Sequence, residues 1–125
     1  MAVSSKDFLD FAIDVLNRTD EIGYRNAIAR AYYAMFHEVT SMMTSMPVYS
    51  SHAHDGLIQY LNNAGGKTES YSQAELRGLA AILRQQKGKR VLSDYDLQGN
   101  ITSADARESI KTAERLFAKC NQMKT

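Results

Sequence analysis

Arg30 and His37 are the residues whose types and spacing are best suited to chemistry, and they lie seven positions apart in one predicted helix. At about 100° per residue, seven positions return almost to the same side of a helix, so both side chains project together. A guanidinium can hold a phosphate in fork geometry, and an imidazole that titrates near neutrality can move a proton. RNA cleavage without a metal needs those two functions, although the same spacing also arises by chance on an exposed face.

Three further polar side chains share that side of the helix. On the same helical wheel, Asn26, Tyr33 and Ser41 fall close to Arg30. The apolar residues predicted to face the core fall on the opposite side: Ile28, Ala31, Tyr32, Met35, Val39 and Met42. Arg30 and His37 are therefore expected to point away from the core of the monomer. Tyr33 can either stack on a nucleobase or pack across an interface between two copies.

The densest basic stretch runs from Arg84 to Arg90 and contains no acidic residue. Lys87, Lys89 and Arg90 are candidates for binding phosphate groups of a substrate. The alternative is that this stretch is the solvated end of a helix that ends around Gly88, where cations oppose the helix dipole.

Arg90 is followed at short distance by Asp94 and Tyr95, and two interpretations remain open. In the first, Arg90 and Tyr95 line a substrate cleft beside the basic stretch. In the second, Asp94 pairs with an arginine and the Tyr95 hydroxyl anchors the loop that leaves the helix.

The histidines and the cysteine do not predict a metal site. His52 and His54 lie in or beside a loop, and no carboxylate spacing completes a site with His37. We expect His54 to cap a helix or to have a structural role. Cys120 continues an apolar helical pattern and is expected in the core, and no cofactor is predicted.

Helical periodicity and capping signals divide the chain into four main helices and one short helix. The predicted ranges are roughly 5–18, 21–44, 55–62, 72–88 and 102–120. In the first helix, Phe8, Phe11 and Ala12 belong to the predicted apolar side. The pair Gly65-Gly66 is expected to cap the short helix, and Ser45–Ser51 reads as a loop. The fold class is therefore an all-α antiparallel four-helix bundle with an additional short helix.

Length and composition favour one folded domain over residues 1–125. The chain has 44% hydrophobic residues, 23% charged residues and one proline. Residues 1–62 hold four Lys and Arg against seven acids, whereas residues 63–125 hold eleven against seven. The acidic residues near the N-terminus exclude a typical signal peptide, and no long apolar stretch predicts a membrane span. We expect a cytoplasmic protein.

Three segments together resemble the HEPN domains of small prokaryotic proteins. They are Arg25 to His37 (RNAIARAYYAMFH), His52 to Gly56 (HAHDG) and Lys89 to Asp96 (KRVLSDYD). The resemblance covers about residues 5–120. It implies a bundle of four to five helices, which agrees with the periodicity.

The resemblance also implies a function. Many HEPN proteins are metal-independent endoribonucleases of toxin-antitoxin or phage-defence type, and they act as homodimers. Their arginine and histidine, four to six residues apart, meet in a composite cleft, and Arg30 and His37 match the upper limit of that spacing. Similar proteins are often encoded beside a minimal nucleotidyltransferase that acts as antitoxin. The expected partners are RNA, a second copy or a higher homo-oligomer, and such an antitoxin.

Two other functions remain open. In many active members a polar residue follows the motif arginine, whereas here that residue is Ala31. This favours a non-catalytic HEPN module that binds a nucleotide, RNA or a protein partner. A helical adaptor without any salt-dependent RNA binding is the third hypothesis.

Overall fold

The computed structural model describes residues 2–125, and this part of the chain is helical without any strand. Six helices follow one another: α1 (Ser5–Leu16), α2 (Glu21–Met42), α3 (Ala53–Asn63), α4 (Gly65–Thr68), α5 (Gln73–Tyr95) and α6 (Ser103–Lys124). The four main helices and the short helix of the sequence prediction are thus confirmed, and α4 adds a single turn.

Capping side chains start the helices where the sequence predicts them. Capping boxes open α1 at Ser4, α5 at Ser72 and α6 at Thr102. The Asp20 side chain accepts a hydrogen bond from the backbone N–H of Gly23 at the start of α2. Each cap satisfies N–H groups that have no partner inside the helix, which fixes the first turn.

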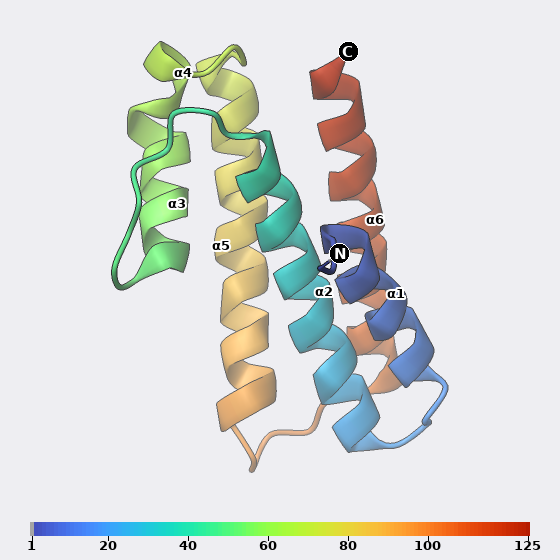
Figure 1. Cartoon of the computed structure of the whole chain (residues 1–125). Helices are drawn as coiled ribbons and strands as arrows, with labels where there is room; N and C mark the ends of the chain where they lie inside the picture. Colours follow the sequence, from blue (N-terminus) through green and yellow to red (C-terminus); the bar gives the residue numbers. More distant parts are fainter. Residues whose placement is uncertain (1) are drawn as a thin grey trace.

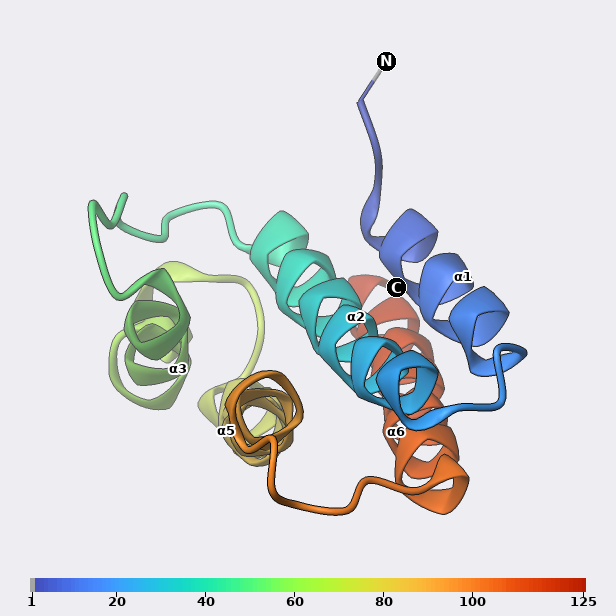
Figure 2. The same cartoon turned by 90° about the horizontal axis from the view of Figure 1, so that it is seen from below.

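Helix α2 is the centre of the bundle and packs against α1, α5 and α6. Figures 1 and 2 show α1 on one side of α2 and α5 on the other, with α3 lying outside α5. Consecutive long helices run antiparallel with the exception of α2 and α3, which run in the same direction. The extended segment that contains Ser45–Ser51 joins these two helices (Figure 1). The side of α2 between α1 and α3 is partly uncovered, because His37 is exposed and Arg30 and Tyr33 are half-buried.

The predicted core side of α2 is confirmed. All six of its apolar residues are buried, and they join buried side chains of the other helices in one cluster that includes Leu57, Leu79, Leu83, Leu116 and Cys120. Phe11 is the exception among the predicted core residues of α1, because its side chain is 51% exposed while Leu9 is buried instead.

Two predicted helix boundaries were wrong. Helix α5 does not end around Gly88 but continues to Tyr95, so Lys87, Lys89 and Arg90 lie within the helix and not at its solvated end. The pair Gly65-Gly66 does not cap α3; Ala64 does so in a right-handed conformation, and the two glycines begin α4. Neither glycine has a positive φ, so the property that suits glycine to a helix C-cap is not used here.

A buried arginine explains the extension of α5. Arg25 is 6% exposed, and its Nη1 donates to the carbonyl of Ser93 while its Nη2 donates to the carbonyl of Gly99. Arg25 also pairs with Glu21 one turn earlier on α2. These bonds hold the last turn of α5 and the following loop against the start of α2. They compensate for the destabilising effect of Gly88 inside α5.

Within residues 2–125, no helix is long and apolar enough to cross a membrane.

Candidate active site

The uncovered side of α2 presents Arg30, Tyr33 and His37 next to one another. The guanidinium carbon of Arg30 lies 5.5 Å from the centre of the Tyr33 ring. The His37 ring is stacked with the same Tyr33 ring, with 6.5 Å between the two ring centres and 27° between their planes. Tyr33 thus bridges the two residues that the sequence singled out, which share one side of the helix as predicted.

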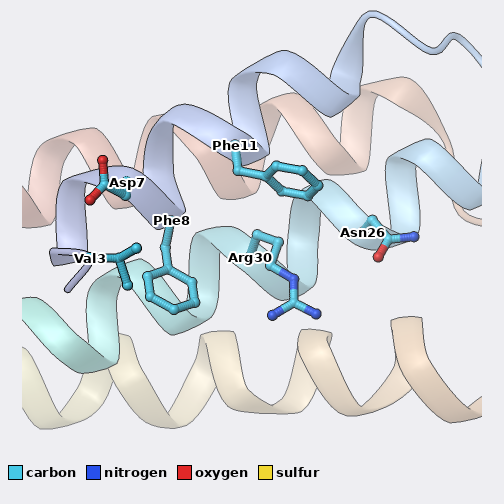
Figure 3. A pocket seen from close by; sticks show the side chains of 6 residues that line it. All are labelled: Val3, Asp7, Phe8, Phe11, Asn26 and Arg30. Carbon is cyan, nitrogen blue, oxygen red and sulfur yellow. The ribbon is translucent and has the colours of Figure 1, made fainter. Parts of the chain in front are cut away.

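Phe8 of α1 and the preceding Val3 line both of the hollows into which Arg30 and His37 open. Arg30 lines a hollow of about 350 Å³ with Asn26, Phe8 and Phe11 (Figure 3). His37 lines a neighbouring hollow of about 490 Å³, which also includes Phe8 and Ser41. The Phe8 ring lies 4.9 Å from the His37 ring.

Arg90 of α5 completes the positive side of this cluster. Its Nη1 donates to the Tyr33 hydroxyl at 3.3 Å and to Asp94 at 3.4 Å. Its guanidinium carbon lies 5.6 Å from the Tyr33 ring centre and 5.8 Å from that of Tyr32, a cation–π arrangement. The ion pair between Arg90 and Asp94 agrees with the interpretation in which Asp94 pairs with an arginine.

His54 packs against the same cluster, and of the capping and structural roles that the sequence indicated, the structure supports the structural one. It does not cap α3, because the cap residue is His52. Instead, its Nδ1 lies 2.8 Å from the Tyr32 hydroxyl, and its ring lies 4.2 Å from that of Phe36. The sequence signal that could have pointed to His54 is the histidine pair at positions 52 and 54. Its hydrogen-bond partner Tyr32, however, lies on α2, 22 residues earlier in the chain.

Desolvation shifts pKa values in this cluster, in which His37 is exposed and His54 is half-buried. Desolvation lowers the pKa of His37 below its ordinary value. Desolvation also lowers the pKa of His54, and the positive charges of Arg90 and Lys87 lower it further, while Asp55 opposes them. Both imidazoles are therefore neutral at pH 7. Burial raises the pKa of the Tyr32 phenol, which stays protonated and can donate.

The other predicted binding residues differ in their contacts and in their exposure. Asn26 lines the Arg30 hollow, and its amide donates to the carbonyl of Ile22. Lys87 forms an ion pair with Asp55 of α3. Lys89 forms no ion pair with any residue of the described range 2–125, and Tyr95 is 73% exposed at the end of α5.

The structure does not give Tyr95 the anchoring role that the sequence allowed, because its hydroxyl makes no hydrogen bond within residues 2–125. Among the same residues, no three His, Cys, Asp or Glu side chains gather as metal ligands would.

A comparison with family models decides what kind of domain this is. The model described as HEPN domain matches residues 4–123, which is nearly the whole chain. The chain belongs to the HEPN family. HEPN domains are known for ribonuclease or nucleotide-binding roles, and they often bind RNA and form dimers. Comparisons with curated proteins and with solved structures give no match.

The structure also shows where the residue after the motif arginine points in this HEPN domain. Ala31 is fully buried in the core, and as the next residue of α2 it points about 100° away from Arg30 around the helix. A polar side chain at this position would face the core and not the hollow that Arg30 lines. The polar group next to Arg30 is supplied instead by Asn26, one turn earlier.

Proposed function

We propose that this HEPN protein is an endoribonuclease that uses Arg30 and His37. The observation that carries the proposal is the continuous set Arg30, Tyr33 and His37 on the uncovered side of α2, with Arg90 in contact with its central member. This set combines a phosphate-binding cation, an aromatic surface and a titratable imidazole. These are the groups that cleavage of single-stranded RNA requires.

In this mechanism His37 removes the proton from a ribose 2′-hydroxyl, because a neutral imidazole is the form that accepts a proton. The 2′-oxygen then forms a bond to phosphorus while the bond from phosphorus to the 5′-oxygen breaks. The proton taken by His37 passes to the departing 5′-oxygen, which leaves a 2′,3′-cyclic phosphate and a 5′-hydroxyl. No metal ion takes part in these steps.

Arg30 stabilises the charge that develops on the phosphoryl oxygens. Its guanidinium carries a fixed positive charge and lines an open hollow together with Phe8, Phe11 and Asp7 (Figure 3). Tyr33 stacks on a base beside the scissile bond, and Lys87, Lys89, Arg90 and Tyr95 bind the flanking phosphates and bases. Asn26 orients the phosphate from the other side of Arg30.

We further propose that the active form is a homodimer. Two exposed apolar side chains, Val3 and Phe11, line the Arg30 hollow, and Ile13 of α1 and Ile22 of α2 are exposed as well. A second copy that covered them would bury apolar surface and bring its own Arg30 and His37 to the same cleft. Family resemblance adds a toxin-antitoxin or phage-defence role in the cytoplasm, with a minimal nucleotidyltransferase as antitoxin.

The test is cleavage of a mixed single-stranded RNA pool in EDTA by wild type, Arg30→Ala and His37→Ala, each checked for folding by circular dichroism. Loss of cleavage in both variants supports the proposal. RNA that is bound but not cut by the wild type would instead support the non-catalytic module. RNA that is neither bound nor cut would support a helical adaptor.

A further inference from the structure

We infer that His54 is a phosphate-binding residue of the same site, acting as a neutral hydrogen-bond donor that Tyr32 holds in one tautomer. The inference rests on the proposed function, because it assigns the anion to the RNA backbone. It adds to the Arg30 and His37 pair a group from α3, which follows α2 in the chain.

The first observation is that His54 and His37 share their neighbours. The Phe36 ring centre lies 5.3 Å from that of His37 and 4.2 Å from that of His54. The Tyr33 ring also contacts both histidines, at 6.5 and 5.9 Å. An RNA phosphate held at His37 is therefore within the same aromatic cluster as His54.

The second observation is the bond to Tyr32. This phenol is 1% exposed, and within the described residues its hydroxyl has the Nδ1 atom of His54 as its hydrogen-bond partner. A buried hydroxyl that had no acceptor would be costly, so the Tyr32 O–H donates and Nδ1 accepts. The ring proton of neutral His54 must then lie on Nε2.

The third observation is that Nε2 is available. It makes no hydrogen bond with any residue between 2 and 125, and it is not among the buried atoms that lack a partner. An N–H group that reaches solvent at this point can donate to a phosphoryl oxygen. His54 would then bind an anion without carrying a charge.

The charges around His54 favour its neutral form. Arg90 and Lys87 face it from α5, His37 faces it from α2, and Asp55 is its neighbour on α3. The two cations disfavour protonation of His54, and each is already paired with a carboxylate, Lys87 with Asp55 and Arg90 with Asp94. Because protonation at Nδ1 would also remove the acceptor of the Tyr32 hydroxyl, the neutral Nε2–H form is the stable one.

The experiment measures how tightly the protein of residues 1–125 binds a fluorescent single-stranded RNA whose 2′-hydroxyls are methylated, so that the RNA cannot be cleaved. We expect His54→Ala to weaken this binding about tenfold, the effect of losing one hydrogen bond to a charged group. His54→Gln, whose amide N–H can replace Nε2–H, should keep most of the affinity. The control is His52→Ala, which removes an exposed histidine and should bind as wild type does.

Two results would overturn the inference. One is wild-type affinity in His54→Ala; the other is a long-range proton–nitrogen NMR spectrum of the wild type in which the His54 proton lies on Nδ1. The spectrum needs no variant, so the inference stays testable if His54→Ala does not fold. Binding is measured separately from cleavage, so absence of cleavage by the wild type would contradict the proposed function and leave this test intact.

Discussion

Nη1 of Arg25 donates a 3.0 Å hydrogen bond to the carbonyl of Ser93, which lies 68 residues later in the chain. The bond joins the first turns of α2 to the last turn of α5, and Nη2 of the same guanidinium reaches the carbonyl of Gly99 in the following loop at 2.8 Å. It aligns the two helices that carry Tyr33 and Arg90. The site therefore depends on a structural arginine that is separate from Arg30.

Replacing Arg25 should destabilise the fold. Arg25→Ala removes two charge-assisted bonds to backbone carbonyls and leaves these acceptors near a cavity, which we expect to cost about 2–4 kcal/mol in the free energy of unfolding. Urea denaturation followed by circular dichroism measures the loss. The control is Arg18→Ala, whose partner Asp20 is 45% exposed and whose loss should cost less than about 1 kcal/mol. Equal stability of the two variants would contradict the role of Arg25.

A substitution at Gly88 tests the course of α5. A Cβ built at Gly88 meets no atom within 4 Å, and the residue lies inside the helix. Gly88→Ala should therefore stabilise the protein by about 0.5–1 kcal/mol. The comparison variant is Gly23→Ala, because a Cβ there would lie 3.0 Å from the carbonyl oxygen of Val15 and should destabilise. A loss of stability in Gly88→Ala would indicate that the helix ends there.

The lowered pKa of His54 predicts how the stability of the fold changes with pH. The pKa of His54 is lowered in the folded protein, first by burial and then by Arg90 and Lys87, so the unfolded chain binds the proton more tightly. The stabilisation is then complete above the unfolded pKa near 6.5 and is lost as the pH falls through the lower folded pKa. Thermal unfolding at pH 7 and pH 5 should show a drop in Tm, and His54→Gln should show a smaller drop.

His52→Gln serves as the control for that comparison, because it removes an exposed imidazole outside the cluster. If the Tm of His54→Gln decreased between pH 7 and pH 5 by as much as the Tm of the wild type, burial of His54 would not be the cause of the pH dependence.

Lys89 predicts a change in the salt dependence of RNA binding. If its ammonium group contacts a phosphate, Lys89→Ala should reduce the slope of log affinity against log salt concentration by about 0.7, the value for one contact with a single strand. Anisotropy titrations at several salt concentrations measure the slope. Lys111→Ala is the matched control, because Lys111 is an exposed lysine of α6. Unchanged slopes in both variants would exclude Lys89 from the binding surface.

Local signals explain which features the sequence predicts well. The capping residues Ser72 and Thr102 and the apolar spacing of Met35 and Val39 act within a few residues, so they fix helix starts and the core side of α2. The relative direction of Arg30 and His37 follows from helix geometry alone. These features were all predictable without knowledge of the tertiary structure.

Long-range contacts explain what the sequence did not predict. Helix α5 passes Gly88 because Arg25, far away in the chain, holds its last turn. His54 joins the site because the Tyr32 hydroxyl meets it across the gap between α2 and α3. Phe11 remains exposed because Leu9 takes its place in the core, which depends on how α1 rotates against α2. Periodicity within one helix carries no information on such contacts.

The central claim is tested most directly by the rate at which His37→Ala cleaves one defined single-stranded RNA in EDTA, at equal concentrations of folded wild type and variant. We predict that the wild type leaves a 2′,3′-cyclic phosphate and a 5′-hydroxyl, and that the variant is slower by about a hundredfold or more. Cleavage by His37→Ala at the wild-type rate would contradict the account.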